Sequence, residues 1–506
     1  MIGNRLWIGI PEPSISSETR QHLLAVKPGG VILFGRNIVS IEQLKQLIDD
    51  LRSLLGNSLV ISLDQEGGRV VRIPGGVTLF PGNLALGSAA LRDRQRALEL
   101  ARLQGRISGK ELRAIGIDVN LAPCVDLLRS SDERGIGSRS FGSDPQLVLE
   151  LASEIGAGHR EQGVHDCWKH YPGIGRATVD PHFGLPTIPG QDSGDHLIPF
   201  RAAARAGASM VMTSHVIAEA LDRENPVTMS RAAVTDHLRG KLGFSGVIIS
   251  DCLEMGGVSG FDFEQVIISA ASAGHDALLV SHTPEMQIRA LRILEQQVAS
   301  DPRFDQAHQA SLQRLDDLSF SSEGDPAQSP SPIEVGTEVA QEIARNGTTL
   351  LSGPAARIDG EGKWLLVLPG IKQRSRVEDP LRGEDLALLV HKLEQRVECV
   401  RIASDPALRE IEQVSDRSAT STGVILLVQG FRHSQAAREM VQSVADKSRR
   451  LIIVLLEDPR DMVAVPDGEK ISVISAYGFR PVHQEAIAGA LLGEFEPSGR
   501  SSMNFL

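Results

Sequence analysis

The 506-residue sequence has few cysteines, no long apolar runs and no excess of positive charge. Its four cysteines are far apart and form no C-x-x-C pair, which argues against a zinc knuckle or a disulfide framework and favours a reducing compartment. No stretch reaches about 18 apolar residues, so we expect no transmembrane span. The 52 lysines and arginines are outnumbered by 64 aspartates and glutamates. The resulting net charge of -12 repels phosphate backbones and disfavours nucleic-acid binding.

The N-terminus does not resemble a secretion signal. Its short apolar run is interrupted by Pro11, Glu12 and Pro13, and no small-residue cleavage site follows. We therefore expect a cytoplasmic protein. Hydrophobic residues make up 41% and charged residues 23%, which is typical of a globular chain.

Short, continuous apolar runs alternate with amphipathic stretches over the first 300 or so residues. Such runs are typical of parallel strands that are buried on both faces. Eight β-then-α units in series favour a closed (β/α)8 barrel over an open sheet. The expected strands are Trp7–Ile10, Gly30–Phe34, Val60–Leu63, Val119–Ala122, Val164–Trp168, Met210–Thr213, Val247–Ser250 and Ala277–Val280.

A stretch rich in serine and proline separates this region from a second βα series. It predicts a barrel domain at 1–318, a linker at 319–333 and a C-terminal α/β domain at 334–506. We expect the second domain to be an open sheet packed beside the barrel. Its expected strands are Trp364–Leu368, Val397–Ile402, Val424–Val428, Leu451–Leu456 and Ile471–Ile474.

Acids, bases and histidines follow six of the eight expected barrel strands. The βα loops converge at the carboxyl ends of barrel strands, so these side chains predict a reactive rim. The alternative is that these side chains are ordinary polar residues at strand ends. That explanation is the better one for any single residue, but it is weaker for six strand ends together. The rim residues are Asp64, Gln65, Glu66, Asp126, Lys169, His170, Ser214, His215, Asp251 and His282.

Asp251 follows directly on a run, GVIIS, that we expect to be buried. A carboxylate at the mouth of a barrel must be paired or hydrogen-bonded to stay ionised, and an ionised one is suited to act as a nucleophile. The alternative is an N-cap of a helix at Cys252–Gly256, because aspartate is a favoured cap. Position alone does not separate the two interpretations.

The segment KHYPGIGRATVDPHFGLPTI predicts a shaped loop rather than regular structure. In an extended stretch, Asp180 and His182 lie on one face, and Pro181 between them favours that geometry. An aspartate beside a histidine fixes the ring tautomer and supports proton transfer. An ordinary Asp–His contact in a surface loop is the simpler interpretation of this pair taken alone.

Several cationic side chains are candidates for holding a hydroxyl-rich or anionic ligand. Each of them, taken singly, is better explained by a salt bridge to a neighbouring acid. They are Arg69, Arg72, Arg139, Lys169 and His170.

The sequence resembles family 3 glycoside hydrolases, and in particular their bacterial β-N-acetylglucosaminidase branch. The matching runs are GGVILFGRNI, ISLDQEGGRVVRI, GIDVNLAPCVDL, IGSRSFGSDP, KHYPGIG, DPHFGLP and LGFSGVIISDCLEM, in the family's order, and ALLGEFEPSGR near the C-terminus resembles the end of the family's second domain.

The resemblance implies a role for each matched residue. Asp251 corresponds to the family's nucleophile, His182 to its general acid/base and Asp180 to the partner of that histidine. Positions that bind the amino sugar in the family are occupied here by Asp64, Arg72, Arg139, Lys169 and His170. The resemblance implies retaining hydrolysis of terminal N-acetylglucosamine from cell-wall fragments, with no cofactor and no metal.

This chain departs from the family pattern at two positions. Ile174 replaces a histidine, and Pro181 replaces a serine or threonine. Two alternatives to hydrolysis remain: a phosphorylase that uses the same site, and a barrel that binds glycans without turnover. The expected partner is a small carbohydrate.

Overall fold

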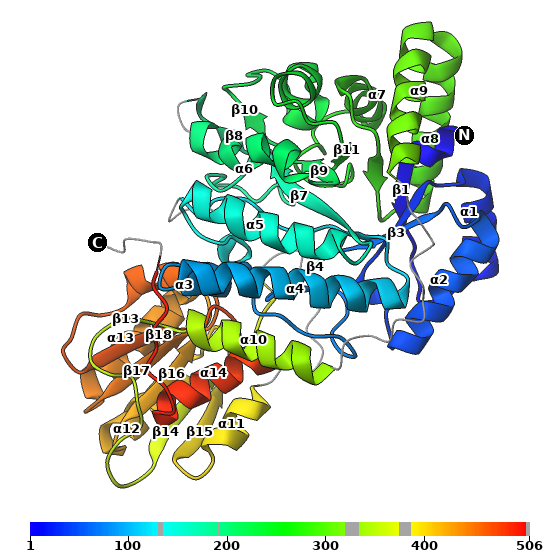
Figure 1. The fold of residues 1–506 in the computed structure, drawn as a ribbon. Coiled ribbons are helices and arrows are strands. Elements are labelled where there is room, and N and C mark those ends of the chain that lie inside the picture. The colour runs from blue at the N-terminus through cyan, green and yellow to red at the C-terminus, as the bar shows by residue number, and fades with distance from the viewer. Residues whose placement is uncertain (130–134, 191–192, 319–332, 374–385, 502–506) are drawn as a thin grey trace.

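The computed structural model describes residues 1–129, 135–190, 193–318, 333–373 and 386–501. These residues form two α/β units, a barrel and a smaller sheet domain that lies against one side of it (Figure 1). No helix among them is both long and apolar enough to cross a bilayer. The expected linker 319–333 lies outside the described residues except for Ile333, which begins a helix.

The first unit is the predicted eight-stranded parallel barrel. Its strand order is β11-β9-β7-β6-β3-β2-β1-β12, and a bridge between Ile249 and Ala277 links the two ends of that order. The barrel fold class is therefore confirmed. The strands are β1 (Leu6–Gly9), β2 (Gly30–Leu33), β3 (Val60–Leu63), β6 (Val119–Asn120), β7 (His165–Tyr171), β9 (Met210–Thr213), β11 (Val247–Ser250) and β12 (Leu278–Val280).

Strand β7 extends further than the sequence predicts. Lys169 and His170 were expected after its end, yet both lie inside it, and both are buried. Polar residues can continue a buried strand here because carboxylates on neighbouring elements pair with them.

Helices surround the barrel and begin at clear capping signals. The side chains of Ser40 and Asp144 accept hydrogen bonds from the first turns of α2 and α5, and Pro145 starts α5. Helix α3 has no polar face, because all eight of its residues are buried. The helices are α1 (Ser17–Val26), α2 (Ile41–Leu55), α3 (Asn83–Ala90), α4 (Arg94–Ile115), α5 (Pro145–Arg160), α6 (Ser193–Ala206), α7 (Phe263–Ala273), α8 (Pro284–Ser300) and α9 (Pro302–Asp317).

The second unit is a six-stranded sheet in the order β13-β18-β17-β16-β14-β15. Five strands are the predicted parallel ones, and the sixth, β13, pairs antiparallel with β18 at the edge. The strands are β13 (Thr349–Ser352), β14 (Trp364–Pro369), β15 (Val397–Ile402), β16 (Val424–Val428), β17 (Leu451–Leu455) and β18 (Ile471–Ser475), and the helices are α10 (Ile333–Gly347), α11 (Ala387–Leu393), α12 (Leu408–Thr420), α13 (Gln435–Lys447) and α14 (Pro481–Leu492).

The two units are joined by a packed interface. Helix α10 lies against α3 and α4 of the barrel and against α14 of the second domain (Figure 1). Three buried hydroxyls meet there: Ser88 contacts Thr349 at 2.8 Å, and Tyr477 donates to Thr349 at 2.9 Å. The Arg480 guanidinium donates to the carbonyl of Gly68. The second domain thus holds the turn after β4 (Gln65–Gly67), which pairs with β5 (Val70–Val71) beside the barrel mouth.

Candidate active site

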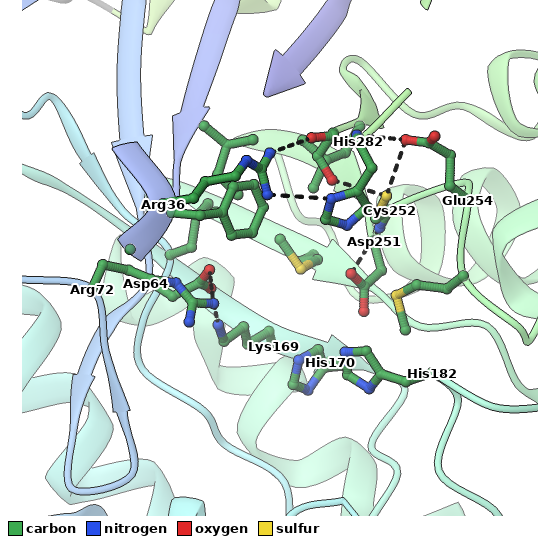
Figure 2. A pocket seen from close by; sticks show the side chains of 18 of the residues that line it. Arg36, Asp64, Arg72, Lys169, His170, His182, Asp251, Cys252, Glu254 and His282 are labelled. Atoms are coloured by element: carbon green, nitrogen blue, oxygen red, sulfur yellow. Dashed lines mark hydrogen bonds and ion pairs between the residues drawn. The ribbon is translucent and has the colours of Figure 1, made fainter. Parts of the chain in front are cut away.

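A cavity of about 480 Å³ opens at the carboxyl ends of the barrel strands. In Figure 2 the Asp251 carboxylate and the His182 imidazole lie on one side of it, and Asp64, Arg72 and Lys169 lie across from them. Apolar side chains such as Phe34 and Met212 complete the wall. The titratable lining residues are Arg36, Asp64, Arg72, Arg139, Lys169, His170, His182, Asp251, Cys252, Glu254 and His282.

A buried ion network forms one wall of this cavity. The Lys169 ammonium donates to Asp64 at 2.6 Å and lies 2.7 Å from a carboxylate oxygen of Glu66. Arg72 donates to the second oxygen of Asp64 at 2.9 Å, and Arg139 makes a two-pronged contact with Glu66 at 2.8 and 2.9 Å. Each cation therefore has a carboxylate partner, as burial of charge requires.

The network also fixes the protonation states of its members. Burial raises the pKa of both carboxyl groups, but the neighbouring cations outweigh it, so the pKa values of Asp64 and Glu66 lie below their usual range. Burial lowers the pKa of Lys169, whereas Asp64 and Glu66 raise it by more, so the net pKa is raised. At neutral pH the wall thus presents fixed charges of both signs.

His170 is held by Asp126, which lies behind the wall. Its Nδ1 is 2.7 Å from an Asp126 oxygen, so it donates there, and Nε2 is left facing Arg139 at 3.4 Å. The other oxygen of Asp126 accepts from the backbone N–H of Ile174 at 2.7 Å. The isoleucine side chain is buried, so this loop is docked by its backbone and an apolar contact.

Asp251 follows β11, but no helix begins there. Residues 251–260 form turns, and the Asp251 carboxylate accepts from the N–H of Cys252 at 2.7 Å. The N-cap alternative is therefore wrong. Among the described residues, no lysine or arginine forms an ion pair with Asp251, in contrast to Asp64 and Glu66. Its half-buried carboxylate faces the cavity.

His215 lies behind this turn rather than in the cavity wall. Its Nε2 donates to the carbonyl of Cys252 at 2.8 Å, and Nδ1 contacts the Thr228 hydroxyl at 2.7 Å. Burial lowers the pKa of His215, so it acts as a neutral support for the segment that carries Asp251.

Asp180 and His182 meet through a turn, and the expected extended stretch is wrong. The N–H of Phe183 donates to the carbonyl of Asp180 at 2.9 Å, which closes a β-turn with Pro181 at its second position. Proline suits that position because its φ is fixed near −65°. One Asp180 oxygen accepts from the His182 N–H at 3.0 Å and lies 2.7 Å from Nδ1. The proton is then on Nδ1, and Nε2 is left available.

Three functional candidates were missed in the sequence. Arg36 follows β2 and donates to the carbonyls of Ile10 and Ser281, each at 2.9 Å, so the strand-end rule applied to β2 would have found it. Glu254 accepts from the backbone N–H groups of His282 and Thr283 at 2.7 and 2.9 Å. Gln373 comes from the second domain, and no sequence signal connects it to the barrel.

One cluster has the composition of a metal site. The ligand atoms of Cys124, Asp126 and His170 lie within 4.8 Å of one another. Its members already bond to each other, since the Cys124 thiol donates to Asp126 at 3.3 Å and Asp126 also accepts from His170. Burial raises the pKa of the Cys124 thiol well above its ordinary value, so it is protonated and a poor ligand. We therefore describe this cluster as the support of His170.

Curated β-hexosaminidases match somewhat more than half of the chain. A β-hexosaminidase of Chromobacterium violaceum is 42% identical over 264 residues, which are 51% of this chain and 72% of that relative. One of Alkalilimnicola ehrlichii is 37% identical over 61% of this chain and 89% of that relative.

Solved structures agree with these relatives. A family 3 β-N-acetylglucosaminidase from Paenibacillus superposes with a TM-score of 0.89 at 31% identity, covering 98% of this chain and 97% of that one. A β-N-acetylhexosaminidase from Beutenbergia cavernae covers 62% of this chain and 96% of its own, with a TM-score of 0.56 at 29% identity. The family model of the glycosyl hydrolase family 3 N-terminal domain matches residues 6–317, and with this match over more than half of its length the chain belongs to that family and is a glycoside hydrolase.

Proposed function

We propose that this protein is a retaining β-N-acetylglucosaminidase that releases terminal, non-reducing N-acetylglucosamine. The observation that carries the proposal is the pairing of Asp251, a half-buried carboxylate with no cationic partner among the described residues, with the Asp180-held imidazole of His182 at one cavity. The name of the Paenibacillus structure specifies the same sugar, and the Chromobacterium relative is named more broadly as a β-hexosaminidase.

In the first step the Asp251 carboxylate attacks the anomeric carbon. His182, charged as an imidazolium, gives its Nε2 proton to the departing glycosidic oxygen. Its Nδ1–H remains hydrogen-bonded to the Asp180 carboxylate during this transfer. The Asp180 carboxylate stabilises the imidazolium before transfer and keeps the ring oriented. The bond from C1 to the leaving oxygen breaks as the bond to Asp251 forms.

In the second step water replaces the aglycone. His182 Nε2 takes a proton from the water, whose oxygen attacks C1 and displaces the Asp251 carboxylate. Two inversions give net retention. A histidine suits this work because its unperturbed pKa is about 6.5 and its neutral form adds no negative charge beside the nucleophile.

The ion network holds the sugar in this scheme. Lys169 uses two of its three N–H donors on Asp64 and Glu66, so the third can reach a sugar hydroxyl. The carboxylate of Asp64 has further lone pairs for hydroxyl donors, and Arg72, Arg139 and His170 line the same wall. Fixed partners of both signs orient the ring for attack.

Stereochemistry and substrate choice together test the proposal. We expect the protein to release p-nitrophenol from the aryl β-N-acetylglucosaminide, with β-N-acetylglucosamine as the first product in proton NMR spectra taken before mutarotation. An α-product would contradict retention, and a preference for the plain β-glucoside would contradict the choice of sugar.

The acceptor needs a separate measurement. A neutral imidazole repels phosphate less than a carboxylate does, and this favours phosphorolysis as the second candidate. We expect hydrolysis, with product formation unchanged by added phosphate. Sugar 1-phosphate as the main product would identify a phosphorylase, and calorimetric binding of N-acetylglucosamine without turnover would identify a binding protein. We further propose peptidoglycan fragments as the natural substrates, and the cytoplasmic location stays a prediction.

A further inference from the structure

The sheet of the second domain has a topological switch point, the kind of place at which open α/β sheets bind ligands. Strand β14 pairs with β15 on one side and with β16 on the other, so the chain reverses its direction of travel across the sheet after β15. In open α/β sheets, such a switch point leaves a crevice at the carboxyl ends of the strands, and ligands bind there. Here the switch point lies between the ends of β14 and β16.

A cavity of about 700 Å³ occupies this edge. We call it the switch-point crevice. Part of its lining comes from the segments that follow three strands, and these are Lys372 and Gln373 after β14, Ser404 and Asp405 after β15, and Gln429 after β16. The rest comes from the turn before α13 and from the start of that helix.

The floor of the crevice is ordered by hydrogen bonds between these segments. The side-chain amide of Gln429 accepts from the Lys372 N–H at 3.0 Å and donates to the Lys372 carbonyl at 3.1 Å. It also donates to Glu457 at 3.0 Å. The Ser434 hydroxyl, at the start of α13, donates to Asp405. The crevice therefore presents hydrogen-bonded amide, hydroxyl and carboxylate groups beside the exposed side chains of Lys372 and His433.

One residue connects this crevice with the catalytic cavity. Gln373 lines both, and it is the second-domain residue in the wall of the barrel cavity as far as the chain is described. The two cavities thus meet at a single exposed side chain.

We propose that the switch-point crevice binds the sugar units on the aglycone side of the scissile bond, with Gln373 as a specificity-determining residue; this rests on the proposed glycosidase function. The amide, hydroxyl and carboxylate lining matches the dense hydroxyl and acetamido groups of a saccharide, which both donate and accept. An aryl aglycone has no hydroxyl or acetamido group to pair with this lining. The second domain therefore selects oligosaccharides.

The test compares substrates with and without a sugar aglycone in the full-length protein. Gln373→Ala removes the connecting amide, and Ser404→Trp fills the crevice. We expect each variant to lose about tenfold or more in kcat/KM on chitobiose and chitotetraose, while kcat/KM on the aryl N-acetylglucosaminide stays within about twofold of wild type in Ser404→Trp, because Ser404 lies outside the barrel cavity. Gln442→Ala, on the same α13 but bonded to Asp446 outside the crevice, is the matched control and leaves all three substrates unchanged.

Each other outcome overturns the inference in a recognisable way. Equal losses on aryl and saccharide substrates in Ser404→Trp would show a general effect of that variant on the barrel site. No loss on any substrate in either folded variant, with melting temperatures within about 3 °C of wild type, would show that the crevice does not contact the aglycone. A wild-type protein that cleaves neither kind of substrate would instead refute the proposed function.

Discussion

The barrel mouth and the switch-point crevice are both formed at the carboxyl ends of parallel strands, yet their chemistry differs. At the barrel mouth, Lys169 and Glu66 are buried ions with partners on both sides. At the crevice, Gln373 and Asp405 are exposed, and neutral amides and hydroxyls prevail. Shared topology thus places a cavity at both sites, whereas buried, paired charge makes the barrel mouth rigid enough for chemistry.

The largest expected difference between the barrel mouth and the switch-point crevice is in catalysis. Asp251→Ala should lower kcat on the aryl N-acetylglucosaminide by at least about 10⁴-fold, because removal of a covalent nucleophile leaves only binding and electrostatic effects. Steady-state assay with purified protein measures this. Asp236→Ala is the control, since that aspartate is exposed and its nearest ion-pair contact is 3.9 Å long. Near-wild-type activity in Asp251→Ala would remove this residue from the role.

The next difference concerns stability. Glu66→Ala should lower the free energy of unfolding by about 3–5 kcal/mol, because it leaves Lys169 and Arg139 buried without their shared partner. Gln435→Ala at the crevice, which removes an exposed contact with Glu439, should cost less than about 0.5 kcal/mol. Urea denaturation measures both. Equal losses of unfolding free energy in the two variants would contradict the difference between the barrel mouth and the switch-point crevice.

The stability contributed by Glu66 should also depend on pH. The folded-state pKa of Glu66 is lowered, so its contribution is fully present above the unfolded pKa of about 4.3 and is lost as the pH falls through the lower folded value. The difference in unfolding free energy between wild type and Glu66→Gln should be constant from about pH 6 to 8 and shrink below about pH 4. A difference that grows on acidification would contradict this sign.

The smallest effect is expected in the loop that follows β7. Ile174→His restores the residue usual in the family but places an imidazole where an apolar side chain is buried, so it should cost about 1–2 kcal/mol. The Ile174 N–H bond to Asp126 survives, so kcat/KM should fall less than about threefold. Paired melting and rate measurements check this, and a rise in activity would show that the loop needs the lost polar contact.

Much of the barrel could be predicted because its strands are short and apolar on both faces, so Val60–Leu63 and Val247–Ser250 are predicted with their observed bounds. Strand β13 could not be predicted, because it is a half-buried edge strand with no such run. Helix α3 lacks the polar face on which helix periodicity depends.

The site residues could be predicted as a set but not as a network. Strand ends place Asp64, Lys169 and Asp251 at one rim, since parallel strands converge there. Arg72 lies only 8 residues from Asp64, but Arg139 and Glu66 are 73 residues apart and Lys169 and Asp64 are 105 apart, and no local pattern encodes these two pairs. The position of Gln373 in the cavity wall depends on how the second domain packs against the barrel, and no pattern in the barrel sequence predicts that packing.

Trapping the glycosyl-enzyme is the most direct test of the roles proposed for Asp251 and His182. In His182→Ala, an aryl N-acetylglucosaminide with a good leaving group needs no acid for the first step but lacks a base for the second. We predict that intact-mass spectra show one added N-acetylglucosaminyl unit and that peptide fragmentation locates it on Asp251. A label on any other residue, or continued turnover with no label at all, would contradict the mechanism.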